Sequence, residues 1–335
     1  MKTSAKTRRM VAALPALVKA LVRHARAPFR SAVRRARGPV RETLSAETLS
    51  ARYCYAVWLR HLVKANRYGL RTDPTSVAEL GPGASLGVGI AALLTGAERY
   101  LALDVVRHAN AAANLSVFDE LVGLFHRRAT IPDSVEFPEV RPRLGSFAFP
   151  DEILTADRLL RSLDSARVTE LRERVRLDQL EYVVPWDDPA AIEAESVDLV
   201  FSQAVMEHVA DLDTTYAAVF RWLKPGGTMW HQIDFRSHGT SPIWNGHWAY
   251  PDWMWRLVRG DAPINRQPLS RHLEAIEAAG FLRIACETEQ AESGIDRTWL
   301  QPVWGWLDDR DLSCASALIQ AVRPARPQPR IAGIS

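Results

Sequence analysis

A glycine-rich turn between two carboxylates is the segment of the sequence best suited to binding chemistry. The string Glu79-Leu80-Gly81-Pro82-Gly83 follows a short apolar run. Glycine lets the backbone approach a ligand closely, and the proline stiffens the turn. Asp104 ends the next apolar run, 21 residues beyond Gly83, where a carboxylate suits the two hydroxyls of a ribose. The turn and this acid together predict a site for an adenosine-type ligand.

Two adenosine cofactors fit this spacing. The dinucleotide fingerprint is G-x-G-x-x-G, with a helix N-terminus bare to receive a pyrophosphate. Here the glycine that follows Gly83 is Gly87, which is one step out of phase. Glu79 is a poor neighbour for a pyrophosphate and a good one for the ammonium of a methionine. Electrostatics therefore favours S-adenosylmethionine, with an NAD(P)-dependent oxidoreductase and a non-catalytic cofactor-binding protein as the alternatives.

Over residues 76–322 the sequence resembles the class I S-adenosylmethionine-dependent methyltransferases. Glu79–Gly83 resembles their first motif, E/D-x-G-x-G-x-G, with Ser85 in place of the third glycine. Trp186-Asp187 resembles the adenine segment, Ser196–Ser202 the fourth strand, Val205–Val209 the "vLEHv" continuation and Leu223–Gly227 the "LkPGG" turn. The resemblance implies methyl transfer from S-adenosylmethionine on a seven-stranded sheet whose last strand is antiparallel. The cofactor-binding residues that it implies are Glu79, Leu80, Gly81, Pro82, Gly83, Ser85, Asp104, Val105, Trp186, Asp187, Ser202 and Gln203.

Helical and strand patterns alternate from residue 45 onward, which indicates an α/β, doubly wound sheet with a Rossmann-like arrangement. The predicted strands are 77–80, 99–104, 180–184, 197–202, 228–234, 282–287 and 315–322, and the predicted helices are 45–70, 90–94, 212–223 and 269–279. The methyltransferase domain then spans 45–322, between an arm at 1–44 and a disordered tail at 323–335.

Two segments do not fit this alternation, namely residues 119–179 and 236–268. Each separates neighbouring strands by more than a usual connection. Both follow strands, at the carboxyl edge where ligands bind in such sheets. We expect them to form a lid over the substrate, or else a structural elaboration or an oligomer contact.

His208 is the candidate catalytic residue. Methyl transfer is a direct displacement, so positioning supplies much of the rate, and a base is needed only when the acceptor loses a proton. A histidine that is neutral near pH 7 suits the proton of a hydroxyl, although His208 could also serve a structural role. We expect His231, Asp234, His238 and Trp244 to bind the acceptor, and we predict no metal site because three such residues in eight positions seldom form one.

The charge distribution bears on partners and location. Residues 1–41 carry twelve Lys or Arg and no Asp or Glu, so the remaining chain has 30 bases (42 − 12) against 39 acids. The acidic body lacks the positive surface that nucleic acids require. The segment from Asn265 to Phe281 resembles methyltransferases found among bacterial polysaccharide and secondary-metabolite genes, which implies a small-molecule or glycan-like acceptor, and we expect methylation at oxygen.

The basic arm predicts either an amphipathic helix on an anionic membrane or a solvated terminus. A secretory signal peptide is a third, less favoured alternative, because Lys19 interrupts its apolar run. Three scattered cysteines favour a cytoplasmic location. Membrane contact through residues 1–41 would then be at the inner face of the membrane.

Overall fold

Seven strands form one sheet in this computed structural model, which describes residues 47–186, 188–259 and 264–325. The order across the sheet is β3-β2-β1-β4-β5-β7-β6, and only the pairings of β7 are antiparallel. The doubly wound fold and its antiparallel last strand are therefore confirmed. The strands are β1 (Ser76–Leu80), β2 (Arg99–Leu103), β3 (Glu181–Val183), β4 (Val197–Gln203), β5 (Leu223–Asp234), β6 (Leu282–Gln290) and β7 (Cys314–Val322).

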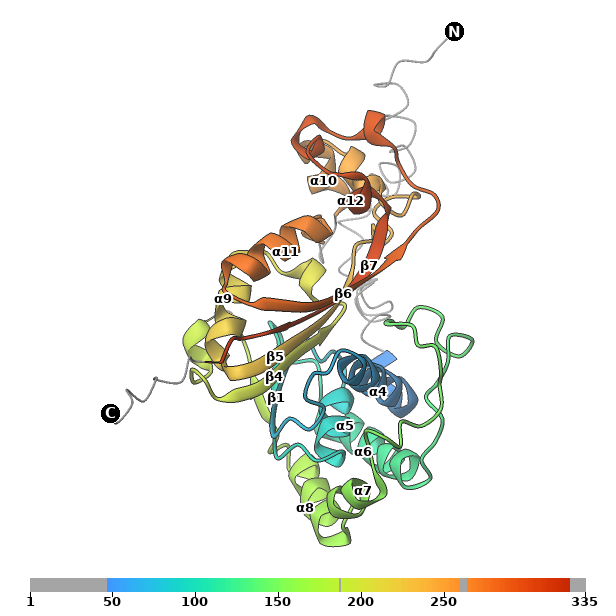
Figure 1. The fold of residues 1–335 in the computed structure, drawn as a ribbon, viewed down its shortest axis with the longest axis vertical. Coiled ribbons are helices and arrows are strands. Elements are labelled where there is room, and N and C mark those ends of the chain that lie inside the picture. The colour runs from blue at the N-terminus through green and yellow to red at the C-terminus, as the bar shows by residue number, and fades with distance from the viewer. Residues whose placement is uncertain (1–46, 187, 260–263, 326–335) are drawn as a thin grey trace, which may run out of the picture.

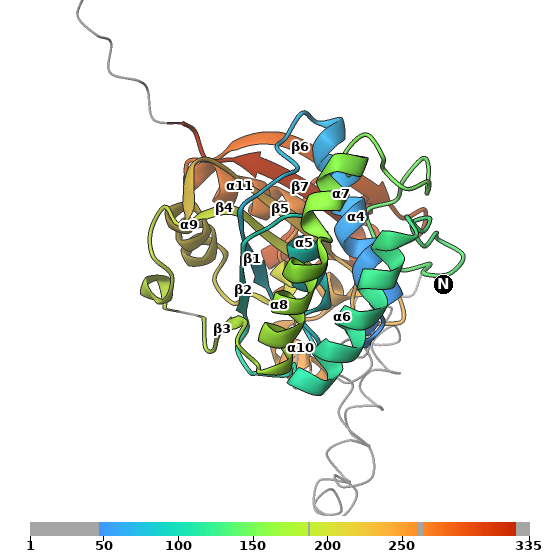
Figure 2. The same ribbon diagram turned by 90° about the horizontal axis from the view of Figure 1, so that it is seen from below.

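Helices cover both faces of the sheet (Figures 1 and 2). On one face lie α4 (Ala51–Arg67), α5 (Gly87–Leu94) and α6 (Ala111–His126), and on the other lie α9 (Leu212–Trp222) and α11 (Leu269–Ala278). Because side chains alternate along β1, Val77 packs in the core between the sheet and α4, α5 and α6, which we call the first core. Ala78 and Leu80 pack in the core between the sheet and α9 and α11, which we call the second core. Strands with apolar side chains on both faces are what a sheet buried between two helical layers requires.

Close packing of α5 on the sheet depends on a glycine. A Cβ at Gly89 would lie 2.0 Å from the ring of Tyr100 on β2. The tyrosine thus occupies the space that any side chain at position 89 would need. This contact fixes the ring of Tyr100 beneath the glycine-rich turn, where its hydroxyl has a partner described below.

The first predicted insertion divides into two parts with different positions. One part contains α7 (Ala156–Ser162) and α8 (Ser165–Arg176), and α8 packs beside α6. Arg158 donates to the carbonyls of Thr72 and Thr95, which precede β1 and β2 at the amino edge of the sheet. The lid prediction is therefore wrong for 156–176, because Leu159, Leu171 and Val175 are buried against the helical layer far from the carboxyl edge.

The other part of the first insertion reaches the carboxyl edge. The guanidinium of Arg60, on α4, donates to the carbonyls of Pro132 and Val140 at 2.8 and 2.6 Å. Farther along, the carbonyl of Arg141 accepts a hydrogen bond from the side chain of Gln203, the last residue of β4. This loop therefore lies over the end of β4.

The second predicted insertion forms a small unit at the upper end of the molecule in Figure 1. It contains α10 (Asp252–Val258), and it packs against residues 291–313, which include α12 (Asp309–Ser313). The guanidinium of Arg266 lies 4.7 Å from the ring centre of Trp255 and 5.3 Å from that of Trp304. We call the described residues of 236–268 together with 291–313 the tryptophan unit.

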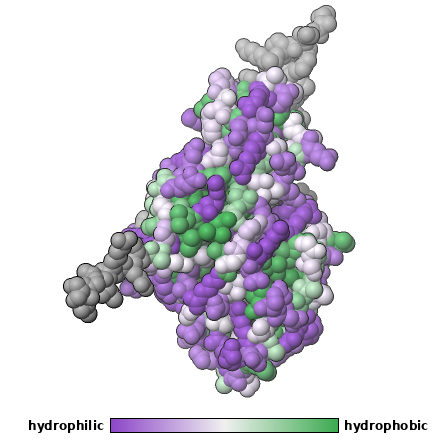
Figure 3. Space-filling view, in the orientation of Figure 1, coloured by the Kyte–Doolittle hydropathy of each residue, from purple (hydrophilic) through white to green (hydrophobic). Residues whose placement is uncertain are grey.

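Outside the tryptophan unit, the face drawn in Figure 3 is mostly hydrophilic, with apolar surface gathered in patches. Leu282 and Ile284 of the edge strand β6 are among the exposed apolar residues. Among the described helices, none combines the length and the apolar character needed to cross a membrane. The predicted arm at 1–44 and the tail beyond residue 325 lie outside the described residues.

Candidate functional site

The glycine-rich turn leaves β1 in a conformation that favours glycine. Gly81 and Gly83 have φ values of +65° and +80°, the left-handed region. A Cβ at Gly81 would lie 2.6 Å from a methyl carbon of Val205, just beyond β4. Thr48 closes the other side, because its hydroxyl oxygen accepts from the backbone amides of Ala84 and Ser85. The turn is therefore held tightly between the exit of β4 and the segment before α4.

Glu79 lies inside the core, behind the turn. Its side chain is buried, and it accepts hydrogen bonds from the hydroxyl of Tyr100 at 2.6 Å and from the backbone amide of Gly89. Burial raises the pKa of this carboxyl to about 8. In this arrangement the partners of Glu79 come from α5 and β2, and its contact with a ligand ammonium stays a prediction. The side chain of Leu80 is likewise buried, in the core on the α9 side.

Asp104 lies at the carboxyl edge of β2, as predicted. It is 8% exposed, and its carboxylate accepts a hydrogen bond from the backbone amide of Val105 at 2.7 Å. Val105 and Val106 are both about half exposed. A carboxylate beside exposed apolar side chains suits a nucleoside, which offers ribose hydroxyls and a flat base.

The adenine segment is described only in part. The ring of Trp186 makes an edge contact with Trp222 of α9, at 6.3 Å between ring centres, and packs against the second core. Asp187 lies outside the described residues. Trp186 therefore has a packing role in this structure.

The two predicted residues at the end of β4 face opposite ways. Ser202 is fully buried, and a 2.8 Å hydrogen bond joins its hydroxyl to Nδ1 of His231 on β5. Its predicted cofactor contact is wrong, because it points into the core beneath α9. Gln203 faces α4, where its amide oxygen accepts from Nε2 of His61 at 3.1 Å.

His231 is a core residue. Burial lowers its pKa to about 3, and its ring lies edge-on to Tyr216 of α9. The predicted acceptor contact of His231 is therefore wrong, because alternation along β5 turns it away from Gln232 and Asp234. Trp244 lies half-buried in the tryptophan unit, and its carbonyl accepts from the backbone amide of Ser237.

A group of histidines and carboxylates meets where β4 and β5 end. Nε2 of His238 lies 3.5 Å from the Asp234 carboxylate and 3.9 Å from that of Glu207. The exposed ring of His208 lies edge-on to His238, at 5.3 Å between ring centres. Burial lowers the pKa of His238, so this imidazole is neutral near pH 7. The structure thus brings together three of the predicted residues, His208, Asp234 and His238.

Sequence reasoning missed Glu207 in this group. Its carboxylate is 2% exposed, and burial raises its pKa well above the usual range. Glu207 is part of the string Val205–Val209, from which only His208 was chosen. The backbone carbonyl of Glu207 accepts from the amide of Asn265, which ties this turn to the tryptophan unit.

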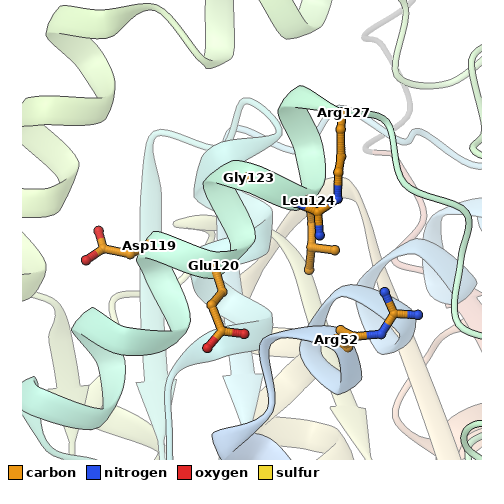
Figure 4. Close-up of a pocket in the computed structure, with 6 residues that line it drawn as sticks. All are labelled: Arg52, Asp119, Glu120, Gly123, Leu124 and Arg127. Atoms are coloured by element: carbon orange, nitrogen blue, oxygen red, sulfur yellow. The ribbon is translucent and has the colours of Figure 1, made fainter.

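The described residues contain no group of three or more His, Cys, Asp or Glu side chains with metal-binding geometry. The hollows among the described residues include these two. One lies between α4 and α6 and is lined by Arg52, Asp119, Glu120, Gly123, Leu124 and Arg127 (Figure 4), none of them a predicted site residue. The other, about 160 Å³, lies at the carboxyl edge beneath Arg141–Arg143 and includes Gln232.

Part of the sequence is similar to known methyltransferases. Residues 157–231, from α7 to β5, match a family model described as a methyltransferase domain. No curated protein matches the sequence. A structure of an S-adenosylmethionine-dependent methyltransferase from Mesorhizobium loti is 15% identical, with 78% of this chain and 96% of that chain covered, at a TM-score of 0.40.

Another similar structure is phosphoethanolamine N-methyltransferase 2 from Haemonchus contortus in complex with S-adenosyl-L-methionine. It is 16% identical, with 86% of this chain and 61% of that chain covered, at a TM-score of 0.40. TM-scores this low identify neither substrate nor mechanism, so the assignment rests on the strand order and the matched sequence. The match over residues 157–231 and the strand order both agree with the class I, Rossmann-like, S-adenosylmethionine-dependent methyltransferases that the sequence resembles.

Proposed function

We propose that this enzyme transfers the methyl group of S-adenosylmethionine to a hydroxyl oxygen of a small-molecule or glycan-like acceptor. The observation that carries the proposal is the meeting of two features at one sheet edge. The turn after β1 and Asp104 after β2 form one half of that edge. The histidine and carboxylate group after β4 and β5 forms the other half.

The residues at the first half suit the cofactor. Asp104 would accept hydrogen bonds from the ribose hydroxyls, and Val105 and Val106 offer exposed apolar surface for the base. The backbone from Gly81 to Gly83 would pass close to the methionine portion. When bound, the sulfonium cofactor supplies an electrophilic methyl carbon.

The second half suits removal of a proton. The bound cofactor would give its methyl carbon to the acceptor oxygen and would keep the electron pair of the carbon–sulfur bond on sulfur. The hydroxyl proton passes to the imidazole of His208, whose ring is exposed at the edge. His238 is a positioning residue in this proposal, since it lies between His208 and the Asp234 carboxylate.

Calorimetric titration of the full chain with S-adenosylhomocysteine and with NADH tests the cofactor assignment. We expect binding of S-adenosylhomocysteine alone, weakened about tenfold by Asp104→Asn because a charge-assisted hydrogen bond is lost. Asp151→Asn is the matched control, since Asp151 forms an exposed ion pair with Arg128. Binding of NADH without binding of S-adenosylhomocysteine would overturn the proposal.

Transfer itself is tested with methyl-labelled S-adenosylmethionine and a panel of acceptors that offer a hydroxyl, an amine or an activated carbon. Label in an acid- and base-stable ether supports oxygen as the target. Label found only on nitrogen or carbon would remove the need for His208 as proposed.

A further inference from the structure

The hollow beneath Arg141–Arg143 is assembled from segments far apart in the chain. Residues of the loop after α6 cover it, and side chains of β5, β6 and β7 form its base and wall. The polar side chains that line it are Arg141, Arg143, Gln232, Glu287, Glu289 and Ser316. Pro142 and Leu318 supply apolar surface. A cavity with this mixture of polar and apolar lining resembles a site for a ligand with both kinds of surface.

The charges around the hollow compensate one another. The guanidinium groups of Arg141 and Arg143 both pair with the Glu289 carboxylate. Glu287 accepts a 2.6 Å hydrogen bond from the hydroxyl of Tyr68 and pairs with the ammonium of Lys64. Two arginines therefore face two glutamates in the lining, so the hollow presents many donors and acceptors without a strong net charge. Such a lining favours a neutral polar ligand over an ion.

Gln232 presents an unused hydrogen-bonding atom. The residue is 3% exposed, and its amide oxygen has no hydrogen-bond partner within the described part of the chain. Its amide nitrogen reaches only the carbonyl of Ile233, at 3.4 Å. A buried amide oxygen without a donor is unfavourable by about 1–3 kcal/mol. A hydroxyl donated by a ligand in the hollow would satisfy it.

The hollow adjoins the proposed reaction site. Ser316 in its wall is the cross-strand partner of Asp234, which contacts His238. Gln232 is the partner of Gln203 at the end of β4. From β5 to β1 is two strand spacings, or about 10 Å. A ligand in the hollow therefore lies on the acceptor side of the edge, within reach of a cofactor at the turn after β1.

We propose that this hollow binds one uncharged, polyhydroxylated ring of the methyl acceptor, that is, a neutral monosaccharide unit. The inference rests on the proposed function and names the class of acceptor. A volume of about 160 Å³ corresponds to about five water molecules at ~30 Å³ each, which is room for about one ring. Gln232 accepts from a ring hydroxyl, Glu289 accepts from another, and Arg143 donates to a third.

Ligand-observed saturation-transfer NMR on the full chain, with S-adenosylhomocysteine present, tests this inference. The probes are methyl α-D-glucoside, methyl α-D-galactoside, methyl α-L-rhamnoside, glucuronate and inorganic phosphate. The variants are Gln232→Met, which removes the amide with little change in shape, and Glu289→Gln, which leaves Arg141 and Arg143 without their carboxylate. Glu277→Gln is the matched control, since Glu277 forms an exposed pair with Arg283 away from the hollow.

We expect at least one neutral glycoside to bind, with about tenfold weaker affinity in Gln232→Met and unchanged affinity in Glu277→Gln. Glu289→Gln should shift the preference toward glucuronate. Preference of the unaltered protein for glucuronate or phosphate would overturn the inference, as would binding of no glycoside or binding that Gln232→Met leaves unchanged. Calorimetry with S-adenosylhomocysteine, measured separately, shows whether such a failure extends to the proposed function.

Discussion

Replacement of Gly81 by alanine isolates the contact between the turn after β1 and the exit of β4. The new Cβ would lie 2.6 and 3.0 Å from the two methyl carbons of Val205. A non-glycine residue in the left-handed region costs about 1–2 kcal/mol, and an added methyl in a packed site costs about 1–3 kcal/mol. The sum is roughly 2–5 kcal/mol, or about 4–10 °C in Tm at about 2 °C per kcal/mol.

Gly226→Ala is the matched control for the backbone part. Gly226 has a φ of +82°, and its added Cβ would meet no atom within 4 Å. Its Tm should fall by only about 2–4 °C, since the left-handed backbone alone contributes. It lies at the start of β5, so binding of S-adenosylhomocysteine should not change, whereas Gly81→Ala should weaken it about tenfold or more.

Val205→Ala in the Gly81→Ala background tests the contact part. Removing both methyl carbons should give a favourable coupling of about 1–3 kcal/mol in a double-mutant cycle, measured by thermal and urea unfolding. Equal losses of Tm in Gly81→Ala and Gly226→Ala would refute the reasoning. So would zero coupling with Val205→Ala, because the cost would then arise from the backbone alone.

Three further predictions concern individual side chains. Burial raises the pKa of Glu79 from 4.5 to about 8, so the folded state binds the carboxyl proton more tightly than the unfolded state does. The stability that this proton contributes therefore falls as pH rises through that window. Glu79→Gln should flatten the dependence of Tm on pH between about 5 and 8, and an unchanged slope would count against this. Asp104→Asn should lower the rate of methyl transfer at low cofactor concentration, and a saturating cofactor concentration should restore that rate. A loss of kcat alone would exclude ribose binding by Asp104. His208→Gln should lower kcat about a hundredfold or more without changing the affinity for S-adenosylhomocysteine, and a normal kcat would assign the proton to another group.

The sequence predicts the sheet well because its information is local. The buried strands β1 and β2 are short, mostly apolar runs, and Gly81 and Asp104 follow them. Since parallel strands end at one edge, strand ends alone locate the residues of that edge. The edge positions of His208, Asp234 and His238 were predicted for the same reason.

Side-chain direction was harder to predict where both faces of a strand are buried. Glu79 points toward Tyr100 instead of the turn, and nothing in the pattern around it distinguishes the two faces. For β5 the signal was present: Trp230 and Gln232 must share one face, so His231 must lie on the other. Applying that alternation would have separated His231 from Asp234.

Segments without periodicity carried the least local information. The two parts of 119–179 differ in position because Arg60 holds one near α4 and Arg158 holds the other at the amino edge. The hollow beneath Arg141–Arg143 depends on side chains from β5, β6 and β7 meeting that loop. Such long-range contacts leave no spacing that a single sequence reveals.

The tryptophan unit affects the order in which the parts of the site can form during synthesis. Its two halves lie on either side of β6 in the sequence, and Trp248 in the first half packs against Ile295, Leu300 and Trp304 in the second. During synthesis the turn after β1 and its partner Val205 emerge about ninety residues before Ile295 does. A nascent chain therefore contains every described segment around the cofactor turn while its acceptor side is still incomplete. Cofactor binding at that stage would stabilise the partly formed sheet before the acceptor side could bind an acceptor.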